Sequence, residues 1–190
     1  MTANKVIIED LHGIYYSNID WEKFCNKTVL ITGANGFLPA YIVQSLLFAN
    51  YINPSLNIKV VALVRNIDKA KIKFKDYLDN KSLEFIIQDV CNAITITGKI
   101  DYIIHAASQA SPKFYGVDPV GTLSANVIGT RNLLELAKKN NVESFLYFSS
   151  GEVYGQVENE HNPVKENYHG YLDPMMVRAC YGESKRMGEL

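Results

Sequence analysis

The sequence lacks the features that mark secreted, membrane-spanning and nucleic-acid-binding proteins. Its 190 residues include three cysteines, Cys25, Cys91 and Cys180, which lie far apart and show no metal-type spacing. So sparse a set predicts reduced, buried packing residues in a cytoplasmic protein, and we expect no metal site. No apolar run is long enough to span a bilayer, and residues 1–10 do not resemble a signal peptide. The formal net charge of -1 provides no field that would attract nucleic acid or a membrane surface.

The chain does contain a regular alternation of apolar strands and helical patterns. Its 47% hydrophobic and 21% charged residues suit a globular domain. Near-continuous apolar strands that alternate with helices predict an α/β fold, in which a doubly wound parallel sheet is covered on both faces. Ligands of such folds bind at the carboxyl ends of the strands. The expected strands are residues 28–32, 58–64, 83–88, 102–105 and 144–149, and the expected helices are 37–49, 67–79, 120–140 and a last one from near Met176.

Two segments are predicted, with one boundary between residues 26 and 27. Residues 1–26 are expected to be an extension ahead of a dinucleotide-binding domain at 27–190. Apolar residues from Ile7 to Tyr15 recur at near-helical spacing and predict a short amphipathic helix. Trp21 and Phe24 are expected to pack this helix onto the domain or onto a second subunit. The helical pattern that reaches Leu190 has no cap and no stop signal, so we expect a truncated chain.

A glycine turn follows the first strand and opens the first long helix. Glycines at this position let the backbone approach a pyrophosphate closely, and the helix N-terminus attracts that anion. A third glycine is usual three residues later, but Pro39 stands there, and the first turn of a helix tolerates proline. The cofactor contacts predicted at this turn are Gly33, Asn35, Gly36, Phe37 and Leu38.

The end of the second strand bears on the choice between NAD and NADP. A carboxylate there would bind the ribose hydroxyls of NAD, but this strand ends in Val64-Arg65-Asn66. Arg65 is a candidate for a 2′-phosphate contact, or else a solvated cation that stacks on adenine. Asp89 and Val90, after the third strand, are predicted to face the adenine. Both cofactors therefore stay open.

A phenol and an ammonium lie four residues apart in Tyr181-Gly182-Glu183-Ser184-Lys185. On a helix these two side chains share one face, and the ammonium of Lys185 favours the phenolate that a general base requires. Ser150 follows the fifth strand, at the edge of the sheet where the ligand is expected. We therefore predict that Ser150 hydrogen-bonds the reacting hydroxyl and shares its proton with Tyr181, whereas Ser149 caps the strand end.

Several motifs occur in order with the spacing found in extended short-chain dehydrogenases/reductases. They are Thr-Gly-x-x-Gly, His105-Ala106-Ala107, Asn126-x-x-Gly129-Thr130, Ser-x-x-Val-Tyr-Gly and Tyr-x-x-x-Lys. Residues 27–190 thus resemble the NAD-dependent epimerase/dehydratase family. The resemblance implies that Ser150, Tyr181 and Lys185 are catalytic, that Asn126 supports the site, and that residues 105–107, Tyr181 and Lys185 contact the cofactor.

Two stretches resemble the UDP-glucuronate decarboxylases of that family: residues 105–112 and residues 178–181 with Lys185-Arg186. Within them, Ser108 and Arg178 are candidate substrate contacts. Related 4,6-dehydratases carry an aspartate where this chain has Gly151, so dehydration is disfavoured, and Glu152 is retained as a catalytic candidate. Pro39 and Arg65 depart from the decarboxylase pattern.

The resemblance implies an enzyme that transiently oxidises the 4-hydroxyl of a nucleoside diphosphate sugar with bound NAD or NADP. A decarboxylating lyase is the first expectation. The alternatives are a 4-epimerase, an NADPH-dependent carbonyl reductase and, for a truncated chain, a non-catalytic dinucleotide-binding module. The substrate domain of the family lies mostly beyond Tyr-x-x-x-Lys, so we expect it to be missing here and this chain to be inactive alone. The resemblance also implies a homodimer.

Overall fold

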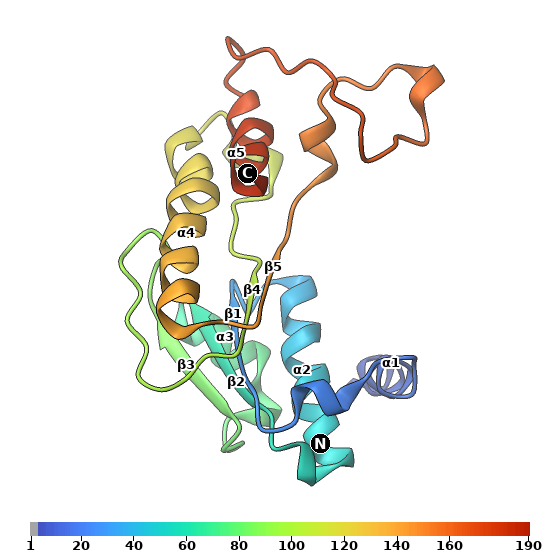
Figure 1. Ribbon diagram of the computed structural model, residues 1–190, viewed down its shortest axis with the longest axis vertical. Coiled ribbons are helices and arrows are strands. Elements are labelled where there is room, and N and C mark those ends of the chain that lie inside the picture. Colours follow the sequence, from blue (N-terminus) through green and yellow to red (C-terminus); the bar gives the residue numbers. More distant parts are fainter. Residues whose placement is uncertain (1–3) are drawn as a thin grey trace.

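Five parallel strands form one sheet in the computed structural model, which describes residues 4–190 (Figure 1). The strand order is β3-β2-β1-β4-β5, so the connection from β3 to β4 returns past β1 and creates a switch point between β1 and β4. This order confirms the predicted doubly wound α/β sheet. The strands are β1 (Thr28–Thr32), β2 (Lys59–Val64), β3 (Leu83–Ile87), β4 (Tyr102–His105) and β5 (Ser144–Tyr147).

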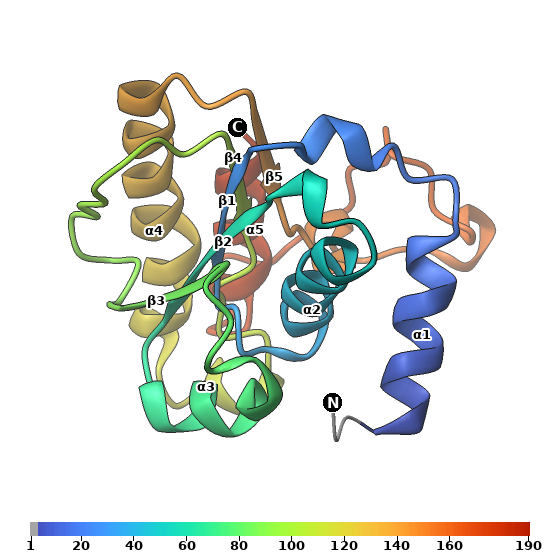
Figure 2. The ribbon, with the colours of Figure 1, turned by 90° about the horizontal axis from the view of Figure 1, so that it is seen from below.

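Helices cover both faces of the sheet. Helices α2 and α3 lie on one face and α4 lies on the other, while α1 lies outside α2 (Figure 2). Helix α5 packs beside α4 (Figure 1). The bounds are α1 (Lys5–Tyr15), α2 (Phe37–Ile52), α3 (Ile67–Lys73), α4 (Pro119–Asn140) and α5 (Ala179–Glu189).

The central strands divide their side chains between two hydrophobic clusters. Successive residues of a strand point to opposite faces, so Val29 and Ile31 of β1 join the cluster under α2, whereas Leu30 joins the cluster under α4. All three are fully buried. Burial on both faces explains why β1 and β2 read as continuous apolar runs. This rigid centre holds the carboxyl ends of β1 and β4 in place.

The amphipathic helix predicted near the N-terminus is present as α1. Leu11 is 1% exposed, and the ring of His12 meets Phe48 of α2 edge-on, with centroids 4.9 Å apart. The chain then turns so that Trp21 stacks on Tyr15 at 5.6 Å and donates from Nε1 to its carbonyl oxygen. The structure thus packs α1 and Trp21 on the face of α2. The boundary between extension and domain stays a prediction.

Some element bounds differ from those expected. The helix predicted over 67–79 ends at Lys73, because Phe74 leaves the helical conformation and is fully buried. The last helix begins at Ala179 rather than near Met176, since the amides of Ala179 and Cys180 bind carbonyls three residues back, in a turn tighter than an α-helix. The strand predicted over 144–149 ends at Tyr147.

The three cysteines are free, as expected, but they are partly exposed rather than buried. No described helix combines the length and the apolarity needed to cross a membrane.

Candidate functional site

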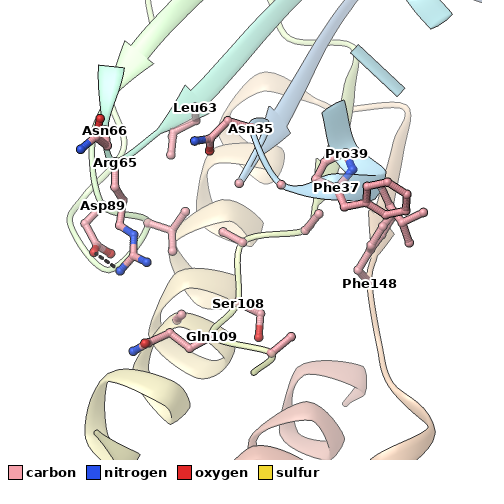
Figure 3. A pocket seen from close by; sticks show the side chains of 18 of the residues that line it. Asn35, Phe37, Pro39, Leu63, Arg65, Asn66, Asp89, Ser108, Gln109 and Phe148 are labelled. Atoms are coloured by element: carbon pink, nitrogen blue, oxygen red, sulfur yellow. Dashed lines mark ion pairs between the residues drawn. The ribbon is translucent and has the colours of Figure 1, made fainter. Parts of the chain in front are cut away.

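A cleft of about 460 Å³ opens at the carboxyl ends of β1, β2 and β4, where the switch point lies (Figure 3). Most of the residues predicted to contact a cofactor line it. They are Gly33, Asn35, Gly36, Phe37, Leu38, Arg65, Asp89, Val90, Ala106 and Ala107, and the substrate candidate Ser108 joins them. The lining does not include His105, Asn126, Tyr181 or Lys185, and all four are buried.

Gly33 brings two loops of the cleft together. Its φ is +61°, and a Cβ built on it would lie 2.9 Å from the Cα of Ala107, closer than real atoms approach. The amide of Gly36 then donates to the carbonyl oxygen of Gly33 at 2.8 Å, which closes the turn. Pro39 lies in the first turn of α2, where the sequence led us to expect that proline is tolerated. The turn therefore keeps its form although the third glycine is missing.

Thr32 fixes the loop that follows β4. Its buried hydroxyl oxygen accepts hydrogen bonds from the amides of Ala106 and Ala107 at 3.2 and 3.1 Å, and it lies 2.8 Å from Nδ1 of His105. His105 is 1% exposed and is not among the residues that line the cleft, so its predicted contact with the cofactor stays a prediction. Burial, with the nearby charge of Lys185, lowers the pKa of His105 to about 4, which keeps the imidazole neutral.

Arg65 and Asp89 meet at one end of the cleft. Nη1 of Arg65 lies 3.7 Å from Oδ2 of Asp89, and their side chains are 65% and 39% exposed (Figure 3). Partial burial would raise the pKa of Asp89, but the amide of Cys91 and the charge of Arg65 outweigh it and hold the pKa below its usual value. The carboxylate is therefore ionised beside a guanidinium.

Tyr181 and Lys185 lie on one buried face of α5, as the spacing predicts. They are 5% and 2% exposed, and Nζ of Lys185 is 5.9 Å from the centre of the Tyr181 ring. The ammonium donates to the carbonyl oxygen of Phe148 at 2.5 Å, and Phe148 lines the cleft. Burial lowers the pKa of Lys185 to about 8. The loop after β5 thus links the Tyr181–Lys185 pair to the cleft.

Asn126 supports α5 from α4. Its side chain is fully buried and donates from Nδ2 to Oγ of Ser184 at 2.9 Å. Ser184 in turn donates to the carbonyl oxygen of Tyr181 at 2.9 Å. This relay fixes the first turn of α5, which agrees with a supporting role for Asn126.

Ser150 and Glu152 lie in the short helical turn after β5. Oγ of Ser150 accepts from the amide of Glu152 at 3.3 Å, and among the described residues no hydrogen bond joins it to Tyr181. Glu152 pairs with Arg178, with Nη2 2.7 Å from Oε1, so two residues predicted to act in catalysis and substrate binding hold each other. Ser149 bonds to Glu189 rather than to the strand end.

Residues 29–190 match the model of the NAD dependent epimerase/dehydratase family. The chain belongs to this family.

Similar proteins agree with this assignment. UDP-glucuronic acid decarboxylase 5 of Arabidopsis thaliana is 37% identical over 169 residues, which are 88% of this chain and 46% of the relative. The UDP-glucuronic acid 4-epimerase of Bacillus cereus, whose structure holds NAD, is 25% identical with a TM-score of 0.64, covering 85% of this chain and 50% of that one. The UDP-Glc/GlcNAc 4-epimerase of Campylobacter jejuni, 23% identical, shares the fold with a TM-score of 0.68, covering 86% and 47%. The chain spans about half the length of the curated relatives it matches.

The sequence reasoning missed several residues of this family member's cleft. Asn66 and Lys69 line it next to Arg65, and Gln109, Ala125 and Phe148 line its other parts. The position of Lys69 was a usable signal, because it lies in the first turn of α3, which begins two residues after Arg65. Phe148 gave no such signal, since the bond between its carbonyl oxygen and Lys185 joins residues 37 positions apart.

Proposed function

We propose that the full-length protein is an NAD(P)-dependent enzyme that acts on a nucleoside diphosphate sugar, as a lyase like the UDP-glucuronate decarboxylases. Family membership and the 37% identity to a UDP-glucuronic acid decarboxylase support this proposal. The main observation behind the proposal is that Phe148 connects the cleft to Lys185. Its side chain lines the cleft and its carbonyl oxygen accepts from Lys185, so the Tyr181–Lys185 pair and the glycine turn serve one site.

The residues of the cleft fit a dinucleotide. A Cβ on Gly33 would collide with the backbone of Ala107, so glycine is needed for the close approach of the two loops that would flank a pyrophosphate. Oγ of Ser108 has no hydrogen-bond partner among the described residues, which leaves it available to a ligand in the cleft. Gly33, Gly36 and the start of α2 would hold the phosphates, and Asp89 and Val90 would face the adenine. When bound, the nicotinamide would accept a hydride from the sugar and return it.

Three side chains would handle the proton in this proposal. Tyr181 takes the proton of the sugar 4-hydroxyl as carbon 4 is oxidised, and it gives the proton back when the carbonyl is reduced. Lys185, held by the Phe148 carbonyl, would keep its ammonium near the phenol that exchanges the proton, with Nζ 5.9 Å from the centre of the Tyr181 ring. Ser150 would turn from the Glu152 amide to the sugar hydroxyl, and the long 3.3 Å bond makes that exchange inexpensive.

Glu152 and Arg178 would meet the sugar side of the site. A keto group at carbon 4 of a glucuronate is β to the carboxylate, so carbon dioxide leaves readily and carbon 5 takes a proton. Arg178 is the cation able to bind the carboxylate, but it has to leave Glu152 first. Gly151 carries no acid, so the chain has no aspartate to protonate a leaving hydroxyl at that position.

The test is an incubation of the full-length protein with UDP-glucuronate, followed by mass spectrometry of the nucleotide sugars. Loss of carbon dioxide without net consumption of the dinucleotide is expected. The 190-residue chain, about half the length of its relatives, is expected to bind the dinucleotide without turnover. An unchanged UDP-glucuronate pool with the full-length protein would count against the proposal. Robust turnover by the 190-residue chain would instead contradict only the expectation that this chain is inactive alone.

A 4-epimerase is the second candidate, because an NAD-bound UDP-glucuronic acid 4-epimerase is 25% identical and shares the fold. It would convert UDP-glucuronate into an isomer of equal mass, which chromatography separates from the substrate. A carbonyl reductase would instead consume NADPH stoichiometrically. The expected homodimer stays a prediction, which light scattering of the full-length protein would test.

A further inference from the structure

The end of β2 presents cations to the cleft. Arg65 follows the last residue of the strand, and Lys69 lies in the first turn of α3. Both side chains are exposed, and both residues line the cleft together with Asn66. Figure 3 shows Arg65 and Asn66 side by side at this end, with the guanidinium directed toward Asp89. Two cations therefore face the region next to the expected adenine site.

The acceptor that NAD requires at this place is missing from the strand. In dinucleotide-binding folds a carboxylate at this strand end accepts hydrogen bonds from the ribose hydroxyls. Here the residues that line the cleft from β2 and α3 are Leu63, Arg65, Asn66 and Lys69. Asn66 uses Oδ1 to accept from the amide of Lys69 at 2.9 Å, so its amide nitrogen is the group left to face a ligand. Guanidinium, ammonium and amide nitrogen are all hydrogen-bond donors.

We propose that Arg65 and Lys69 form a subsite for the 2′-phosphate of NADP, so that the cleft binds NADP(H) in preference to NAD(H). This proposal rests on the proposed function, because it takes the cleft to hold a dinucleotide. A 2′-phosphate brings two negative charges and several acceptor oxygens to donors that would otherwise face bare ribose hydroxyls. The 2′-phosphate offers this donor set both acceptor oxygens and negative charge, whereas the 2′-hydroxyl of NAD can accept but brings no charge to the two cations.

Asp89 pairs with Arg65, but the pair leaves the guanidinium able to bind a phosphate. The charged groups are 3.7 Å apart, with side chains 65% and 39% exposed, and ion pairs that water reaches in this way contribute little. Asp89 is also anchored by the amide of Cys91 at 2.9 Å, so it stays in place when the guanidinium turns to a phosphate. The negative charge of Asp89 reduces the preference for NADP. We therefore expect NADP to bind about tenfold more tightly than NAD, rather than a complete exclusion of NAD.

The experiment titrates NADP⁺, NAD⁺, 2′,5′-ADP and 5′-AMP into the protein by isothermal calorimetry at low and high salt. The two mononucleotides differ by the 2′-phosphate alone. NADP⁺ and 2′,5′-ADP are expected to bind about tenfold more tightly than NAD⁺ and 5′-AMP, with a gap that narrows in salt. Arg65→Ala and Lys69→Ala should each reduce the difference in affinity between NADP⁺ and NAD⁺, while the affinity for NAD⁺ stays within about twofold of wild type. Lys71→Ala, which removes a cation of α3 outside the cleft, should leave it unchanged.

The outcomes separate the two proposals. Equal binding of NAD⁺ and NADP⁺, or a gap that survives both Arg65→Ala and Lys69→Ala, overturns the subsite and leaves the proposed function intact. Circular dichroism checks that the protein is folded. If the folded protein binds none of the four compounds, the proposed function is overturned together with the subsite.

Discussion

The ring of Tyr115 stacks on the ring of Tyr181, with centroids 4.7 Å apart and an interplanar angle of 13°. Tyr115 is 3% exposed and donates from its hydroxyl to the carbonyl oxygen of Ala110 at 3.1 Å. Burial, with smaller effects of nearby charges, raises the pKa of Tyr115 to about 12, so its hydroxyl stays protonated as a donor. The loop after β4 thus packs directly on the proposed catalytic phenol.

Substitutions of Tyr115 should separate the contribution of this ring stacking to stability from the contribution of the hydrogen bond. Tyr115→Phe keeps the ring and should cost about 1 kcal/mol of unfolding free energy for the lost hydrogen bond. Tyr115→Ala also leaves a cavity against Tyr181 and should cost about 3–5 kcal/mol. Urea unfolding measures both, and Tyr171→Ala, at a site that is 66% exposed, is the control with little expected change. Equal losses for the Phe and Ala variants would show that the stacking contributes nothing.

Gly33 and Gly98 offer a matched pair for the glycine turn. Both have positive φ, +61° and +99°, but a Cβ on Gly98 would meet nothing within 4 Å, whereas one on Gly33 would collide with Ala107. Gly98→Ala should therefore cost only backbone strain, on the order of 1–2 kcal/mol. Gly33→Ala should cost more and should weaken dinucleotide binding, which Gly98→Ala leaves unchanged. Urea unfolding and calorimetry test this pair, and wild-type dinucleotide affinity in Gly33→Ala would contradict the role given to the turn.

The alternation of continuous apolar runs with helical stretches was enough to predict the sheet, because burial on both faces makes β1 and β2 apolar along their length. The cleft was predicted where a motif carries its own chemistry, as at Gly33 or Tyr181. The missed parts depend on contacts between distant segments. Nothing in the sequence shows that Thr32 binds the amides of Ala106 and Ala107. Nor does it show that the ring of His105 is buried against Phe145 and Tyr147 of β5.

His105 should make the protein sensitive to acid. Its pKa is about 4 when folded and 6.5 in a model peptide, so the unfolded chain binds the extra proton between these values. Stability is thus fully present above pH 6.5 and falls as the pH drops toward 4. The loss between pH 7 and pH 4.5 should be about 2 kcal/mol. Urea unfolding at both pH values should show a smaller loss in His105→Asn, which keeps a polar atom near Thr32.

The control for His105 is His161→Asn, which removes an exposed imidazole and should keep the wild-type pH dependence. If His105→Asn lost as much stability on acidification as the wild type, another group would be responsible.

Tyr181 is expected to contribute to the rate and not to cofactor affinity. In the full-length protein, Tyr181→Phe should lower turnover of UDP-glucuronate by about 10²- to 10⁴-fold, the usual contribution of a general base. The ring and its stacking on Tyr115 remain, and Lys185 still bonds to Phe148, so dinucleotide affinity should stay near wild type. Tyr171→Phe is the exposed control.

The products of the same assay test the significance of Gly151. Because Gly151 supplies no acid, a 4-keto-6-deoxy sugar should not accumulate from any hexose substrate. Full activity in Tyr181→Phe would remove Tyr181 from the proton transfer, and a dehydrated product would remove the significance assigned to Gly151.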